Sequence, residues 1–205
     1  GTTGLTGADD SGRWFALVKS QGVSEKGEGA GGSFGIGKSS PFAASRFRTV
    51  FYGTRTEDGG VALQGVSRLA THANASRKLT QGVGFIGVYD AVGGEGGDPV
   101  FRAVRREQDI PAFFRRNEPG TDIWVIGYAS GDEWQADLVR SIVNNFWPAI
   151  HQGIIRFRVG GQEISSENLE DVILRNAGAD DFDAHHYYPT VSAQPIRKVL
   201  RTVGE

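Results

Sequence analysis

A glycine-rich run, Gly32-Ser33-Phe34-Gly35-Ile36-Gly37-Lys38-Ser39-Ser40, is central to interpreting this chain. Glycines carry no side chain, so the backbone N–H groups of such a run can approach an anion closely. A helix-like stretch follows at residues 41–47, and the start of a helix adds a dipole that favours negative charge. We therefore expect this run to bind phosphate groups.

The same run matches the P-loop pattern G-x-x-x-x-G-K-[ST]. A P-loop follows a buried strand, whereas residues 20–31 are polar and glycine-rich and predict no strand. Asp90, after a strand candidate at 84–89, offers a match to the metal-binding aspartate. A P-loop NTPase is therefore kept as an alternative. The residues of the match are Gly32, Gly37, Lys38 and Ser39.

Two further glycine motifs flank the run. The chain opens with Gly1-Thr2-Thr3-Gly4-Leu5-Thr6-Gly7, and the pair Gly120-Thr121 enters a strand candidate at 122–128. The order of the three motifs resembles the GHKL ATPase family, which includes gyrase, the ninety-kilodalton heat-shock chaperone, MutL and histidine kinases. The resemblance covers about residues 1–160. It is closest to the chaperone branch, whose phosphate loop has the form Gly-x-Phe-Gly-Val-Gly-Phe.

This resemblance implies a site for ATP and Mg²⁺. The first motif would hold adenine, the second would wrap the phosphates with Lys38 neutralising developing charge, and Thr121 would close the base pocket. Residues 8–31 would form a lid that orders on nucleotide. The implied nucleotide-binding residues are Gly1, Gly4, Gly32, Phe34, Gly35, Ile36, Gly37, Lys38 and Thr121.

The chain departs from the family pattern at its start. Gly1 and Gly4 match the Asp-x-Gly-x-Gly turn loosely, because one extra residue separates them and the adenine-holding Asp is absent. The family's helix that carries the general base and a magnesium ligand is also absent, so we assign no catalytic or metal-binding residue and expect the base upstream of Gly1. The chain opens within a motif and contains no Met. We therefore expect it to be part of a longer protein.

Hydrophobic periodicity predicts an α+β fold. Strand candidates alternate or are rich in β-branched residues, and a helix is expected at 132–147, where apolar residues recur at helical spacing. With the resemblance, we expect a two-layer sandwich of the GHKL type, whose mixed, mainly antiparallel sheet has helices on one face. We expect an ATP-binding domain at 1–160 and an appendage at 161–205. The remaining strand candidates are 47–54, 61–70, 82–89, 99–104 and 154–159, and the short helices are 109–116 and 166–174.

Composition narrows the class of protein further. The chain has 205 residues, of which 39% are hydrophobic, and a net charge of −2, which gives no electrostatic case for non-specific binding to nucleic acid or membranes. It contains no Cys, which excludes disulfides and thiol chemistry within it. We expect a cytoplasmic, magnesium-dependent ATPase that forms a homodimer and drives a conformational or dimerisation cycle on a protein or nucleic-acid client, with no membrane partner. A non-catalytic nucleotide-binding or scaffold domain is the other alternative.

Overall fold

The computed structural model describes residues 3–7, 9, 11–20, 36–73, 75–93, 99–176, 184 and 188. The chain forms two compact units, Gly1–Ala129 and Ser130–Glu205. This division differs from the expected boundary at 160/161, because residues 130–160 cluster with the C-terminal part of the chain.

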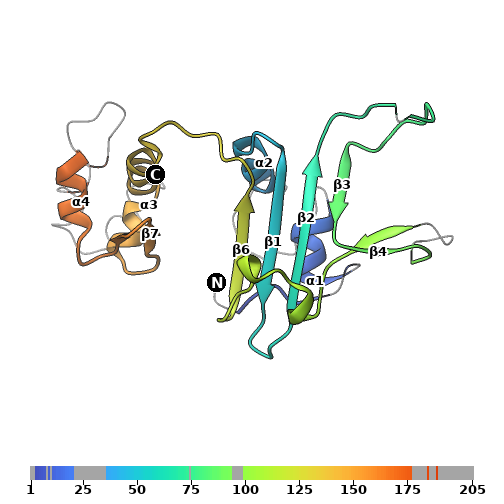
Figure 1. Ribbon diagram of the computed structural model, residues 1–205. Coiled ribbons are helices and arrows are strands. Elements are labelled where there is room, and N and C mark those ends of the chain that lie inside the picture. The colour runs from blue at the N-terminus through green and yellow to red at the C-terminus, as the bar shows by residue number, and fades with distance from the viewer. Residues whose placement is uncertain are drawn as a thin grey trace, which may run out of the picture. The chain divides into compact units, whose positions relative to one another are not determined.

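The first unit is built on a four-stranded sheet with the order β3-β2-β1-β6 (Figure 1). Every pairing in this sheet is antiparallel. The sheet therefore confirms the expected α+β class with a mainly antiparallel sheet. Its strands are β1 (Thr49–Arg55), β2 (Val61–Arg68), β3 (Val83–Ile86) and β6 (Gly120–Val125).

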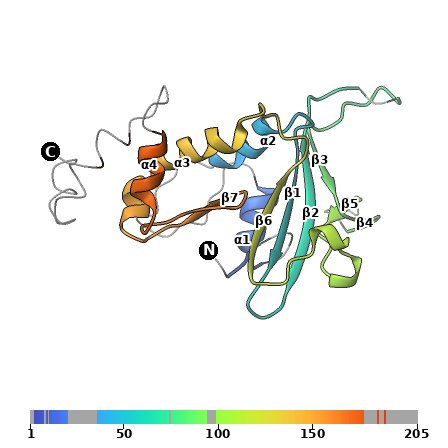
Figure 2. The ribbon, with the colours of Figure 1, turned by 60° about the vertical axis from the view of Figure 1, so that its left-hand side comes forward.

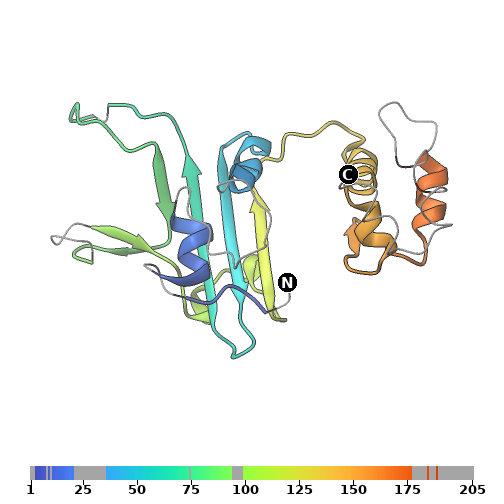
Figure 3. The same ribbon diagram turned by 180° about the vertical axis from the view of Figure 1, so that it is seen from behind.

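One face of the sheet carries the core of this unit. Alternate residues of β1, including Val50 and Tyr52, are buried on this face because side chains of a strand point to opposite sides in turn. Two short helices, α1 (Gly12–Trp14) and α2 (Ser40–Ala44), lie on the same side of the sheet (Figure 3). The buried cluster comprises Trp14, Val18, Phe42, Val50, Tyr52, Ala62, Val66 and Ala103.

The first of these helices was not anticipated. Gly12–Trp14 continues directly into a π-helical turn, η1 (Phe15–Lys19), although we expected residues 8–31 to form a lid. Trp14 is fully buried and Val18 nearly so. Residues 11–20 therefore belong to the core of the unit, and the remainder of the expected lid lies almost entirely outside the described residues.

Aromatic side chains pack on the opposite face of the sheet. The rings of Phe51 and Phe114 stack with centroids 5.0 Å apart, and Phe114 meets Trp124 edge-on at 5.0 Å. A Cβ on Gly53 would overlap the Trp124 ring, so glycine at this position lets the indole lie against the sheet. Figure 2 shows α1 and α2 on one side of the sheet and the segment that contains Phe114 on the other.

Two expected elements are interrupted by single residues. The strand expected at 82–89 is divided into β3 and β4 (Val88–Asp90) by Gly87, where a Cβ would overlap the carbonyl oxygen of Arg102. β4 pairs with β5 (Val100–Arg102) in a separate hairpin. The helix expected at 109–116 is instead two 3₁₀ turns on either side of Pro111, η4 (Glu107–Asp109) and η5 (Ala112–Phe114).

Residues 134–176 of the second unit form two helices and a hairpin. Its core includes Val143, Ile150, Ile164 and Leu169, all fully buried. The first helix extends beyond the expected 132–147 and continues past Pro148. The elements are α3 (Trp134–His151), β7 (Phe157–Val159), β8 (Gln162–Ile164) and α4 (Leu169–Asn176).

Candidate functional site

The opening glycine loop packs tightly on one end of the central strand. Gly4 has a φ of +73°, a conformation that residues with a side chain rarely adopt. A Cβ at this position would also overlap the carbonyl oxygen of Arg55. The next residue, Leu5, donates its N–H to the hydroxyl of Thr54 at 2.7 Å. Gly1 lies outside the described residues.

The Thr54 hydroxyl also contacts the Gly120-Thr121 pair, which lies on β6, the neighbouring strand of β1. Thr54 Oγ1 donates to the carbonyl oxygen of Gly120 at 3.1 Å, and the Thr54 side chain is buried. Thr54 stands directly opposite Thr121 in the antiparallel ladder, so both side chains lie on the same face of the sheet. One threonine therefore joins the opening loop to a strand more than a hundred residues later.

A small cavity lies beside this junction. Its volume is about 300 Å³, and residues of the opening loop, including Thr6 and Gly7, form one wall with Thr54. Arg105 also lines it, donates to the carbonyl oxygen of Gly7 at 3.0 Å, and pairs with Asp9 at 3.5 Å. This cavity offers hydroxyl groups, backbone groups and one guanidinium to a polar ligand.

The end of the glycine-rich run lies against the buried helix. Residues Ile36–Ser39 form a 3₁₀ turn, η2, that leads into α2. Lys38 Nζ donates to the carbonyl oxygen of Ala16. Burial lowers the pKa of Lys38, and the positive charge of Arg68 lowers it further. α2 has only five residues, so the dipole expected at its start is weak. The predicted residues Gly32, Phe34 and Gly35 are not among those that the structure describes.

Residues 12–19 connect the two glycine motifs. Trp14 donates its backbone N–H to the carbonyl oxygen of Thr6 at 2.9 Å, and Lys38 reaches the carbonyl oxygen of Ala16 two residues further along. Two helical residues rise by only about 3 Å. The opening loop and Lys38 are therefore attached to neighbouring positions of one helix.

Gly37 is exposed, and its environment is open. No atom lies within 4 Å of a Cβ built on it. Its backbone φ is not among the positive values of this chain, so the unfavourable backbone angle that would have required glycine is absent. A role for Gly37 therefore depends on the approach of a ligand.

The described residues offer little to a magnesium ion. Within them, no three metal-ligating side chains lie close together. Magnesium in nucleotide sites is held by one or two carboxylates together with the phosphates. No residue described here is assigned to Mg²⁺, and no step proposed below depends on it.

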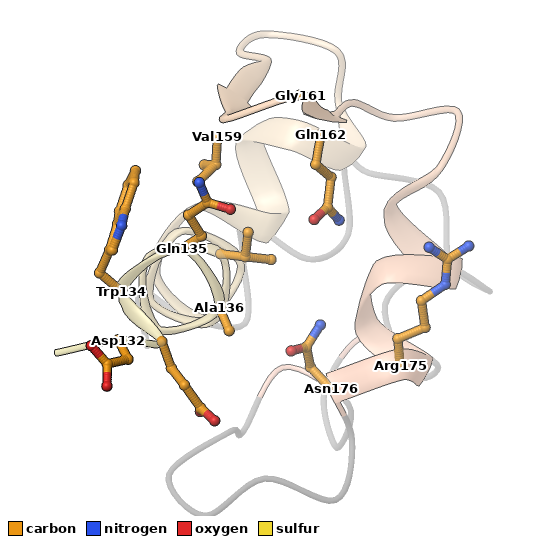
Figure 4. Close-up of a pocket in the computed structure, with 11 residues that line it drawn as sticks. Asp132, Trp134, Gln135, Ala136, Val159, Gly161, Gln162, Arg175 and Asn176 are labelled. Carbon is orange, nitrogen blue, oxygen red and sulfur yellow. The ribbon is translucent and has the colours of Figure 1, made fainter.

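A larger cavity, of about 760 Å³, lies within the second unit (Figure 4). The first turn of α3 contributes Trp134 and Gln135, the start of β8 contributes Gln162, and the end of α4 contributes Arg175 and Asn176. None of the residues predicted from the glycine motifs lines it. Sequence analysis missed this cavity because its walls come from three separate elements.

Comparison with known proteins found no match for this chain among protein-family models, curated proteins or solved structures. Of the helices that the structure describes, none combines the length and apolar character needed to cross a membrane.

Sequence analysis also missed Thr54 and Arg68. Thr54 is the last residue of the strand expected at 47–54, and its hydroxyl lies on the buried side of that strand. Arg68 was included in the strand expected at 61–70, and its Nη1 donates to Ser39 Oγ at 2.9 Å. Thr54 could have been found from the sequence, because it is a polar residue on the core side of a predicted strand. Nothing in the sequence distinguishes Arg68.

Proposed function

We propose that this chain is an ATP-binding domain that resembles the GHKL family. In this proposal the base lies near Gly4 and Thr121, and backbone N–H groups of Gly35, Ile36 and Gly37 hold the phosphates together with Lys38. The observation that supports it is the pair of hydrogen bonds at Thr54, which join the opening loop to the Gly120 strand. These are two of the motifs on which the resemblance rests.

The arrangement of the sheet favours this proposal over a P-loop NTPase. A P-loop leaves a strand of a parallel sheet, whereas all strand pairs among the described residues of the first unit are antiparallel. The residues that lead into Gly32 lie outside the described residues. The position of adenine in a structure with a bound ATP analogue distinguishes the two alternatives, because only the GHKL-like arrangement requires adenine beside Gly4 and Thr121.

Hydrolysis is the second part of the proposal. The family chemistry is attack of water on the γ-phosphate, driven mainly by positioning and electrostatic stabilisation. Lys38 would supply positive charge for that step. We further propose that the hydrolysis cycle changes the conformation or dimerisation of the domain. ATP binding without turnover in the presence of magnesium would instead identify a non-catalytic nucleotide-binding domain.

Calorimetric titration of the chain with ATP tests the proposal through two matched substitutions. Gly37→Val and Gly131→Val both add a side chain at an exposed glycine with no atom within 4 Å of its Cβ. We expect the wild-type chain and Gly131→Val to bind ATP, and Gly37→Val to lose binding while keeping the thermal stability of the wild type. Failure of the wild type to bind ATP, or equal affinity in all three proteins, would reject the proposal.

A further inference from the structure

Arg68, the last residue of β2, has only uncharged partners among the described residues. Its Nη1 donates to Ser39 Oγ at 2.9 Å, and its guanidinium carbon lies 4.2 Å from the centre of the Phe42 ring. Its Nε is buried and has no hydrogen-bond partner among the described residues. A buried donor without an acceptor destabilises the structure, and an added oxyanion would supply the missing hydrogen bond.

Several other arginines of the first unit have their charge neutralised by a carboxylate. Five of them form an ion pair with a carboxylate, whereas Arg68 forms none with a described residue. A cation that is partly withdrawn from water is normally paired, because removing a charge from water is costly. Arg68 differs from the other described arginines that form no such pair, because its Nε is buried and has no acceptor among the described residues. The paired arginines are Arg55, Arg102, Arg105, Arg106 and Arg116.

A second cation stands beside Arg68. Lys38 precedes Ser39, the residue that Arg68 contacts, and the charge of Arg68 helps to lower the Lys38 pKa. Two neighbouring cations raise each other's free energy, and an anion bound between them removes that repulsion. The Ser39 hydroxyl lies at the same place and supplies a neutral hydrogen-bonding group.

The sequence around this pair contains few acids. No Asp or Glu occurs between Glu28 and Glu57, and none occurs between Asp58 and Asp90. These two stretches include η2, α2, β1 and β2, which carry both cations and the two residues that the Arg68 guanidinium contacts, Ser39 and Phe42. The local sequence therefore provides no carboxylate beside Arg68.

We infer that Arg68, together with Lys38 and Ser39, binds the terminal phosphoryl group of a nucleoside triphosphate. This inference rests on the proposed function and adds a specificity-determining residue to it. A guanidinium presents planar, paired donors that match a phosphoryl group, and two cations at one site favour the most highly charged end of the ligand. Arg68 thus distinguishes a triphosphate from a diphosphate.

The test compares ligands that differ only in their phosphates. ATP, ADP and inorganic triphosphate are titrated into the wild type, Arg68→Gln, Arg68→Lys and the control Arg106→Gln, in about 0.15 M salt to limit long-range effects. Arg106 is an exposed arginine of the same unit and pairs with Asp109 at 2.6 Å. The control therefore removes one positive charge without touching the proposed site.

We expect Arg68→Gln to weaken ATP and triphosphate about 10- to 100-fold and ADP less than about threefold. Arg68→Lys should restore part of this loss, because it keeps the charge without the planar donors. The control should match the wild type for all three ligands. Thermal denaturation without ligand identifies any variant that fails to fold, and Arg68→Lys then carries the comparison.

The possible outcomes separate this inference from the proposed function. ATP binding that is unchanged in Arg68→Gln, or weakened equally for ATP and ADP, overturns the inference and leaves ATP binding intact. Triphosphate binding that depends on Arg68 in a chain that does not bind ATP rejects the nucleotide and supports an anion site. A wild type that binds neither ligand overturns both.

Discussion

The two ends of the four-stranded sheet differ in how their polar groups are satisfied. At the opening-loop end, the buried Thr54 hydroxyl accepts from Leu5 and donates to Gly120, so it is hydrogen-bonded within the protein. At the end of β2, Arg68 retains a buried donor without an acceptor and a charge without a carboxylate among the described residues. The hydrogen bonds at Thr54 hold the backbone segments in place. The unpaired donor of Arg68 can instead form a hydrogen bond with a ligand.

The largest expected effect of a single substitution is at the opening loop. Gly4→Ala introduces a side chain at a φ of +73° and against the carbonyl oxygen of Arg55, so both strain and overlap destabilise the fold. We expect a loss of about 3 kcal/mol in the free energy of unfolding, measured with urea. Gly59→Ala is the matched control, because Gly59 has a φ of +85° and no atom within 4 Å of its Cβ.

The control should cost about 1 kcal/mol, which reflects strain alone. Equal losses at Gly4 and Gly59 would show that the close approach of the loop to β1 contributes nothing.

A second substitution addresses the hydroxyl at the same end of the sheet. Thr54→Val keeps the shape of the side chain but leaves the Leu5 N–H and the Gly120 carbonyl without this partner. We expect a loss of about 2–3 kcal/mol in the free energy of unfolding. Thr54→Ser retains the hydroxyl and should lose about half as much or less. A Thr54→Ser variant as unstable as Thr54→Val would contradict a role for the hydrogen bonds.

Substitution of Lys38 should reduce the affinity for ATP more than it reduces the stability of the fold. Lys38→Ala should weaken ATP about 10- to 150-fold and ADP less, because one charge-assisted contact to the γ-phosphate is worth about 1.5–3 kcal/mol. Calorimetry with both nucleotides measures the difference. An equal loss of affinity for ATP and ADP would show that Lys38 does not contact the terminal phosphate.

The smallest expected effect is a dependence on pH. Burial and the Arg68 charge lower the pKa of Lys38, so its ammonium loses its proton at a lower pH than a free lysine. ATP affinity should therefore fall at alkaline pH, at a pH below the ordinary lysine pKa of 10.5. The contribution of Lys38 to stability changes in the opposite sense, because the unfolded chain binds more protons in this range and stability rises with pH.

Lys38→Arg provides the control, since a guanidinium stays charged throughout this range. It should bind ATP with an affinity that is nearly independent of alkaline pH. A wild type with an equally flat profile would show that the Lys38 charge is not part of the site.

Much of the sheet could be predicted from the sequence, because its signals are local. β1 contains β-branched and aromatic residues, and both β1 and β2 lie within two residues of the expected bounds at each end. The long helix α3 was predicted from its spacing of apolar residues. The breaks at Gly87 and Pro111 were missed because they depend on the approach of Arg102 and on a turn geometry that no periodicity reveals.

The helix α1 was missed because polar and glycine-rich residues surround it in the sequence. Trp14 and Val18 are four residues apart, the spacing of one helical face, and both are buried. We gave this spacing no weight, because the surrounding residues are rich in glycine and the family resemblance predicted a lid here. Helices of this length depend on tertiary packing for their stability, so the sequence around them carries little information.

The candidate site was predictable only in part. The meeting of the opening loop with the Gly120 strand was expected from the family resemblance, and the structure brings these segments together at Thr54. Thr54 and Arg68 themselves depend on strand register and on contacts between distant residues, which a single sequence does not encode in any local pattern.

A structure of the chain with a non-hydrolysable ATP analogue tests the central claim most directly. We expect adenine beside Gly4 and Thr121, with the terminal phosphoryl group at Lys38 and Arg68. An analogue bound instead in the cavity of the second unit, beside Trp134 and Arg175, would contradict it.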